Sequence, residues 1–297
     1  GDNKFRSHGD EGLGNVDLRT SIVKSSNTYY YALANDLGVD AIHDFMAPFG
    51  FGQITGIDLH GEQSGILPSQ AWKRAAYKRA DQQRWYAGET ISLGIGQGYN
   101  SFTMLQLASA TATLANRGVQ YPPHLMRAIR ESRNSTTQTM SSVTPRDLNL
   151  NQKNVDHIIE AMVGVTQEGT SRLSFANAPY LSAGKTGTAQ AVTIGQNEKY
   201  DAKKLAEYER DHALYIAFAP TDAPEIALAI VVENAGFGSA HAAPIARRVF
   251  DYVLLGQYPS EADIAAVQQG QATAPIGEPR AVADVPLIRT VDPTTSE

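Results

Sequence analysis

Three strand-like segments in the second half of the chain constrain its fold more than any other feature. The first follows Ser182 and alternates small and apolar residues as far as Val192, and the others span 212–219 and 226–233. A five-residue link that begins and ends with proline joins the last two, and a charged stretch at 197–210, expected to be solvated, separates the first two. This arrangement predicts three antiparallel strands, of which the first two form a long-looped hairpin.

Amphipathic segments flank these strands. The clearest is 151–166, whose apolar residues recur at helical spacing on one face. Other helices are expected at 28–37, from Asp40 to the glycine-rich stop at 48–52, at 103–116 and at 240–255. The chain is therefore predicted to be α/β, of the α+β type, with an antiparallel sheet flanked by helices.

Composition excludes several classes of protein. The chain has 297 residues, a formal net charge of -6 and no basic block or stripe, so we expect no nucleic-acid partner. It has no cysteine, which excludes disulfides and thiolate metal sites. Histidines such as His212, at the start of a strand, lack a partner at ligand spacing and are interpreted as structural.

The first of the three strands carries the residues Lys185, Thr186, Gly187 and Thr188. Lysine supplies a cation, the two threonines supply hydroxyls on one face of the strand, and glycine lets another backbone approach closely. A polar strand end with a solvated lysine is the plainer interpretation. The chemical one is an exposed sheet edge that binds an extended peptide ending in a carboxylate.

A second polar element lies far upstream, where Ser25, Ser26 and Asn27 precede three consecutive tyrosines. By themselves these residues are typical of a helix junction, with Asn27 as N-cap of the next helix. Ser-x-Asn followed much later by Lys-Thr-Gly is, however, the motif pair of penicillin-binding proteins and serine β-lactamases. The pair favours the chemical interpretation of both elements.

Two stretches lie between these motifs. Gly94, Gly96 and Gly98 alternate in Gly-Ile-Gly-Gln-Gly-Tyr, which matches no phosphate-binding pattern and predicts a tight support loop before helix 103–116. The basic and aromatic stretch at 72–79 is interpreted as a solvated surface helix.

The chain resembles the transpeptidase domain of class B penicillin-binding proteins, and among them the elongation-type penicillin-binding protein 2. The resemblance is carried by residues 25–31, 94–99, 185–190 and 211–220 and extends from about residue 12 to 256. It implies a penicillin-binding, serine β-lactamase-like fold over residues 1–258. The Pro-, Ala- and Gln-rich segment at 259–297 lies outside the resemblance and is predicted to be a disordered tail.

The resemblance also implies an activity, which is peptidoglycan D,D-transpeptidation during cell elongation. In the family a serine forms an acyl-enzyme with a stem peptide ending in D-Ala-D-Ala, and an amine of a neighbouring stem peptide accepts the acyl group. By this resemblance Ser25 relays a proton and Asn27 binds the substrate amide. Lys185, with Thr186 and Thr188, holds the terminal carboxylate, and the Thr188 N–H contributes to an oxyanion hole.

Family members also carry a Ser-x-x-Lys nucleophile motif upstream of Ser-x-Asn. Two matches occur here, at 21–24 and 182–185. The second shares its lysine with the substrate-binding strand, and the first directly adjoins Ser25, so one short helix would have to place both of its ends around the same carbonyl. We therefore expect the nucleophile and any membrane anchor to lie upstream of Gly1, in a longer protein.

The resemblance implies further properties of that longer protein. It would be a β-lactam target with a periplasmic domain on an inner-membrane anchor, and its partners would be membrane proteins of the elongation complex. No cofactor or metal is expected. Two alternatives stay open: a serine β-lactamase or D,D-carboxypeptidase that uses water as acceptor, and a non-catalytic module that binds penicillin without turnover.

Overall fold

The computed structural model describes residues 13–130, 135–139, 143–191, 205–271 and 273–285. The α-helices are α1 (Leu18–Val23), α2 (Asn27–Leu37), α3 (Val39–Met46), α4 (Gln70–Ala76), α5 (Ala80–Gln83), α6 (Ala87–Leu93), α7 (Met104–Ala115), α8 (Gln152–Gln167), α9 (Arg172–Phe175), α10 (Gly238–Leu255) and α11 (Glu261–Gln268). The 3-10 helices are η1 (Ala47–Phe49), η2 (Glu207–Glu209) and η3 (Val282–Asp284). The strands are β1 (Val119–Gln120), β2 (Ala128–Ile129), β3 (Gln138–Thr139), β4 (Arg146–Asp147), β5 (Ala183–Ala189), β6 (His212–Ala219), β7 (Ile226–Val232), β8 (Gln257–Tyr258) and β9 (Arg280–Ala281). In these described ranges, no helix combines the length and apolar composition needed to cross a bilayer.

The three predicted strands form one antiparallel sheet in the order β5-β6-β7. Lys185 lies opposite Ile216, which in turn lies opposite Ala229. The sequence prediction of three antiparallel strands is confirmed, and β6 has the predicted bounds. Most of the charged stretch at 197–210 lies outside the described residues, and its last part contains η2.

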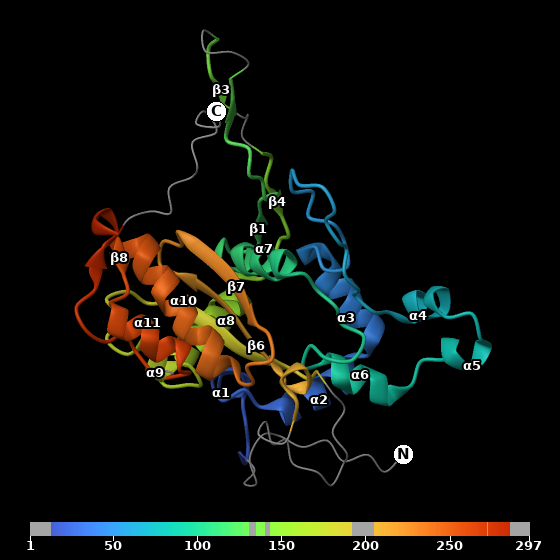
Figure 1. Ribbon diagram of the computed structural model, residues 1–297. Helices are drawn as coiled ribbons and strands as arrows, with labels where there is room; N and C mark the ends of the chain where they lie inside the picture. Colours follow the sequence, from blue (N-terminus) through green and yellow to red (C-terminus); the bar gives the residue numbers. More distant parts are fainter. Residues whose placement is uncertain (1–12, 131–134, 140–142, 192–204, 272, 286–297) are drawn as a thin grey trace.

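Helices cover both faces of this sheet (Figure 1). On one face, Ile22 of α1 and Val155, Ile159 and Met162 of α8 pack with Phe218 of β6. On the other face, α10 packs against the side chains of β6 that alternate with Phe218. This alternation follows from the two-residue period of a strand, and it places the core in two layers, one on each side of the sheet.

Small residues explain how closely α10 approaches the sheet. Ala213 and Ala217 of β6 face Ala242 and Ala246 of α10, and all four are fully buried. Gly238, at the start of the helix, lies so close that a Cβ there would be 2.5 Å from the carbonyl oxygen of Gly187. The start of α10 therefore packs directly against the backbone of the Lys-Thr-Gly segment, on the face of the sheet that α10 covers.

A lobe of short helices, α4 to α6, extends away from the sheet (Figure 1). The interpretation of 72–79 as a solvated surface helix is wrong at Lys73, which is buried and forms an ion pair with Glu89. The Lys73 Nζ lies 5.4 Å from the ring centroids of Trp85 and Tyr99. Aromatic faces and a carboxylate compensate the buried charge, which composition alone does not reveal.

The segment after Tyr258 also differs from the prediction of disorder. It contains helix α11 and strand β9, which pairs with β8. Asp263 of α11 is 1% exposed and forms an ion pair with Arg248 of α10. The segment is poor in large apolar residues, but the buried pair of Asp263 and Arg248 attaches α11 to α10. Residues 286–297 of the predicted tail lie outside the described residues.

Candidate functional site

Strand β5 lies at the edge of its sheet, because the sheet order begins with it. Its residues Lys185, Thr186, Gly187 and Thr188 are all partly exposed. The alternation of strand side chains places Lys185 on the face that α1 and α8 cover, and Thr186 and Thr188 on the opposite face. The predicted edge strand with its polar side chains is therefore present.

The central contact of the site joins Lys185 to Ser25. The Lys185 Nζ donates a hydrogen bond of 2.7 Å to the Ser25 Oγ, across 160 residues of sequence, and another of 2.8 Å to the carbonyl oxygen of Thr186. Within the described residues, no carboxylate forms an ion pair with this ammonium. An ammonium has three donors, so these two hydrogen bonds among the described residues leave one donor for a ligand.

Burial perturbs this lysine. Desolvation lowers the pKa of Lys185 from 10.5 to about 8. The side chain is nevertheless protonated in most molecules at neutral pH. A partly desolvated cation that keeps a free donor is suited to binding an anionic group.

Ser25 has a strained backbone. Its φ of 55° lies in the left-handed region, immediately after the C-cap residue Lys24 of α1, where glycine is the usual residue. Serine at such a position costs roughly 1–3 kcal/mol unless the surroundings impose it. The turn between α1 and α2 thus holds the hydroxyl of Ser25 against Lys185 at the expense of local stability.

Asn27 lies on the same turn but makes a different contact. The prediction that Asn27 is the N-cap of α2 is wrong, because Ser26 is the N-cap and Asn27 is the first helical residue. Ser26 is 1% exposed, and its hydroxyl lies 3.3 Å from that of Thr28. The Asn27 side chain hydrogen-bonds the hydroxyl of Tyr31, whose pKa burial raises overall. The structure brings Ser25 to Lys185, whereas the Asn27 side chain bonds Tyr31 of its own helix.

Two further residues touch the β5 segment, and the sequence did not single them out. The Thr170 Oγ1 lies 3.0 Å from the Thr186 Oγ1, and the Gln97 Nε2 donates a 3.3 Å hydrogen bond to the carbonyl oxygen of Thr188. The sequence placed Gln97 only in a support loop and gave Thr170 no role. Only the tertiary structure shows that both side chains contact the same strand.

Both Ser-x-x-Lys matches are unsuited to nucleophilic catalysis. Ser21 is fully buried and donates to the carbonyl oxygen of Leu18 at 2.6 Å, while Lys24 is exposed. Ser182 is 1% exposed, and the lysine of its motif is Lys185, which contacts Ser25. A nucleophile needs access to substrate and a base within hydrogen-bond reach, and neither serine has both.

The described residues contain no group of three or more His, Cys, Asp or Glu side chains that could hold a metal ion. His212, interpreted from the sequence as structural, accepts a 3.0 Å hydrogen bond at its Nδ1 from the backbone N–H of Asn234. This bond connects the start of β6 to the residues after β7.

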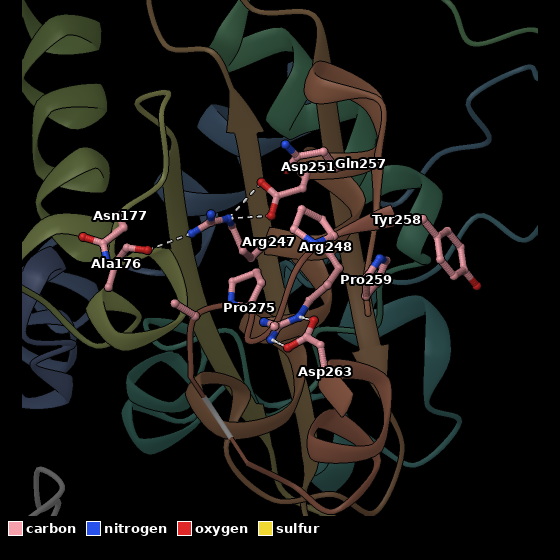
Figure 2. Close-up of a pocket in the computed structure, with 13 residues that line it drawn as sticks. Ala176, Asn177, Arg247, Arg248, Asp251, Gln257, Tyr258, Pro259, Asp263 and Pro275 are labelled. Carbon is pink, nitrogen blue, oxygen red and sulfur yellow. Dashed lines mark hydrogen bonds and ion pairs between the residues drawn. The ribbon is translucent and has the colours of Figure 1, made fainter. Parts of the chain in front are cut away.

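A separate cavity lies beside the C-terminal half of α10 rather than at β5. Figure 2 shows its lining, which includes Arg247, Arg248, Asp251 and Asp263. Each arginine is paired with a carboxylate in the cavity wall. Because the charges of the wall compensate one another, β5 is the stronger candidate for binding an anionic ligand.

The chain is similar to known proteins over most of its length. A family model described as the penicillin binding protein transpeptidase domain matches residues 1–251. The chain is similar to the peptidoglycan D,D-transpeptidase MrdA of Acinetobacter baumannii, with 42% identity over 254 residues, which are 85% of this chain and 36% of that protein. It is similar to MrdA of Escherichia coli K12, with 36% identity over 255 residues, which are 85% of this chain and 39% of that protein.

Solved structures resemble the chain as well. The crystal structure of Pseudomonas aeruginosa PBP2 in complex with WCK 5153 has 40% sequence identity and a TM-score of 0.71, and the match covers 86% of this chain and 52% of that one. The complex of PBP2 and MreC from Helicobacter pylori has 28% identity and a TM-score of 0.68, covering 86% and 43%. The chain spans well under half the length of the two curated relatives described above.

Proposed function

Since the chain belongs to the penicillin-binding protein transpeptidase family, we propose that it supplies the substrate-binding strand of a peptidoglycan D,D-transpeptidase. The observation that carries this proposal is the contact between Lys185 and Ser25. Two motifs 160 residues apart meet at 2.7 Å beside an exposed strand edge. The substrate would be a stem peptide ending in D-Ala-D-Ala.

In the proposed complex the stem peptide lies along β5 as an added strand. Its terminal carboxylate accepts a hydrogen bond from the remaining donor of Lys185. The hydroxyls of Thr186 and Thr188 donate further hydrogen bonds to the peptide from the opposite face of the strand. Gly187 leaves room for the peptide backbone beside it. Charge-assisted hydrogen bonds of this kind are worth about 1.5–3 kcal/mol.

The roles in bond making follow from the same geometry. A serine of the longer protein attacks the carbonyl between the two D-alanines and forms an ester, and the terminal D-alanine leaves as an amine. Ser25 accepts a hydrogen bond from Lys185, so its own O–H can pass a proton to that leaving nitrogen. Ser25 regains a proton from the base that has deprotonated the attacking serine, so the proton lost by one group reaches the other. The Thr188 N–H stabilises the oxyanion, and Asn27 binds the substrate amide after exchanging its contact with Tyr31.

The assembly of the longer protein is also a proposal. The Helicobacter pylori relative was solved with MreC, and another similar structure is described as a peptidoglycan synthase complex. We infer a periplasmic domain on an inner-membrane anchor, with membrane proteins of the elongation machinery as partners and β-lactams as inhibitors. We keep residues 1–258 as the proposed extent of the transpeptidase unit, although α11 packs onto its last helix.

Peptide binding tests the proposal at its central contact. A synthetic peptide ending in D-Ala-D-Ala should bind this chain, and the same peptide with a C-terminal carboxamide should bind at least about tenfold more weakly, because a charge-assisted bond is lost. Lys185→Ala should remove this preference for the carboxylate. The matched control Lys24→Ala removes an exposed lysine near the site and should leave the preference unchanged.

Equal binding of the acid and the amide by the unmodified chain would contradict the proposal. In the longer protein, Lys185→Ala should also slow acylation by benzylpenicillin, measured by intact mass. Rapid hydrolysis of benzylpenicillin by that protein would favour a β-lactamase instead.

A further inference from the structure

The loop that follows α6 contacts both halves of the candidate site. Gly94 lies against α2, where a Cβ would come within 2.4 Å of the carbonyl oxygen of Tyr30. Three residues later, the Gln97 side chain reaches the Thr188 carbonyl oxygen on β5. One short loop therefore touches the helix that begins at Asn27 and the strand that carries Lys185.

The Thr188 carbonyl oxygen, to which Gln97 donates, lies on the outer edge of β5. In an antiparallel pair, alternate residues turn both backbone groups toward the partner strand, and the residues between them turn both away. Gly187 and Leu214 lie opposite each other, and the Gly187 nitrogen and the Leu214 oxygen approach the same point beside Gly238, as in a hydrogen-bonded pair. Thr186 and Thr188, on either side of Gly187, consequently turn their carbonyls outward.

Both of these outward carbonyls accept side-chain donors. The Thr186 oxygen accepts from the Lys185 Nζ at 2.8 Å, and the Thr188 oxygen accepts from the Gln97 Nε2 at 3.3 Å. A peptide that adds as a strand must donate its own N–H groups to acceptors on this edge. It therefore competes with the two side chains for the same oxygens.

The backbone of the loop is held in place, so that only the side chain of Gln97 can readily leave. The Gln97 N–H donates to the Ser92 carbonyl oxygen at 3.1 Å. The Tyr99 hydroxyl donates to Glu89 at 2.9 Å, and Glu89 also pairs with the buried Lys73. Rotation about the side-chain torsions of Gln97 would release Thr188 without moving this anchored backbone.

We propose that Gln97 is a positioning residue that caps the substrate-binding edge of β5 and is displaced from the Thr188 carbonyl when a stem peptide binds. The proposal rests on the proposed function, because it assumes a peptide that adds to this edge. In the absence of substrate, the Gln97 amide satisfies an acceptor of an exposed strand, which also protects the edge from pairing with other chains. In the complex, a peptide N–H takes its place.

Removing the cap should strengthen peptide binding. Gln97→Ala should bind the D-Ala-D-Ala peptide about two- to fivefold more tightly, the lower part of the range for one net hydrogen bond. Gln97→Asn keeps the amide but is one methylene too short to reach Thr188, so it should bind as tightly as Gln97→Ala. Gln82→Ala, which alters an exposed glutamine of α5, is the matched control and should bind like the unmodified chain.

Nuclear magnetic resonance of the Gln97 side chain gives a second readout that a purely structural role would not move. Its NH2 signals, assigned by their loss in Gln97→Ala, should shift toward those of solvent-exposed glutamines as peptide saturates the chain. Weaker or unchanged binding in both Gln97 variants would overturn this inference and leave the proposed function standing. If the unmodified chain and both variants bind no peptide, the proposed function fails and this inference fails with it.

Discussion

Two regions of the molecule differ in how their buried charges are compensated. At the C-terminal half of α10, Arg247 donates to both carboxylate oxygens of Asp251 at 2.9 Å, and Arg248 pairs with both oxygens of Asp263 at 2.6 and 3.0 Å (Figure 2). On β5, Lys185 lies on the sheet face opposite α10 and contacts only a hydroxyl and a carbonyl among the described residues.

The difference separates structural charges from a charge kept for a ligand. Burying a charge costs free energy that a matched partner offsets. Where the chain supplies that partner, as around Arg247 and Arg248, the pair attaches one element to another. Where the described residues supply none, as at Lys185, burial lowers the pKa and a ligand can supply the partner. A cavity lined by arginines is therefore a weaker sign of an anion site than a lone lysine on an open strand.

The largest effect is expected where a paired charge loses its partner. Asp263→Ala leaves Arg248 buried without its carboxylate and should lower the free energy of unfolding by about 3–5 kcal/mol. Denaturant titration followed by circular dichroism measures the change. The control Asp81→Ala breaks the exposed pair with Arg79 and should cost less than about 1 kcal/mol.

A double variant sharpens this test. In Arg248→Met with Asp263→Leu, both charges are replaced by apolar groups, so much of the lost stability should return. A loss from Asp263→Ala as small as that from Asp81→Ala would show that α11 is not attached to α10 through this pair.

How far the sequence predicted the molecule depends on the range of the interactions. The family, the three antiparallel strands and the helices α2, α3, α7, α8 and α10 were predicted correctly, because motif residues and hydrophobic periodicity are local signals. The Lys73 cluster and the attachment of α11 were not predicted, because each needs partners 15 or more residues away. The composition of a segment does not show whether its charges are paired.

The same limit applies to the candidate site. The sequence identified Ser25 and Lys185 through their motifs, and the structure places them in contact. It gave no reason to select Gln97 or Thr170, because a glutamine or threonine in a turn is unremarkable until the strand beside it is known. The left-handed φ of Ser25 was equally hidden, since glycine is the residue expected there.

Lys185, which has no carboxylate partner among the described residues, should give peptide binding a pH dependence that the paired arginines cannot give. With a pKa of about 8, the ammonium is charged at pH 7 and loses its proton as the pH rises through 8. The affinity for the D-Ala-D-Ala peptide should be highest below pH 8 and then fall by up to about tenfold per pH unit.

Isothermal titration calorimetry between roughly pH 6.5 and 9.5, a range that brackets this pKa, measures the fall. The carboxamide peptide should show little of it, because its binding does not depend on the ammonium. Lys185→Arg keeps its charge throughout and should flatten the profile. A profile for the unmodified chain that stays level through pH 9 would mean that the lysine is not the group that binds the carboxylate.

The smallest effect should have the opposite sign to that of Asp263→Ala. Lys185→Met removes a desolvated cation with no carboxylate partner among the described residues, and should raise the free energy of unfolding by about 1 kcal/mol at pH 7.

Because the folded chain holds this proton less tightly than the unfolded chain, the unmodified protein gains stability as the pH rises from 8 toward 10.5. The advantage of Lys185→Met should therefore shrink over that interval. Denaturant titrations of both proteins at about pH 7 and about pH 9.5, on either side of the lowered pKa, measure this change. A variant that is less stable at both pH values would place Lys185 with the arginines of α10, as a structural charge.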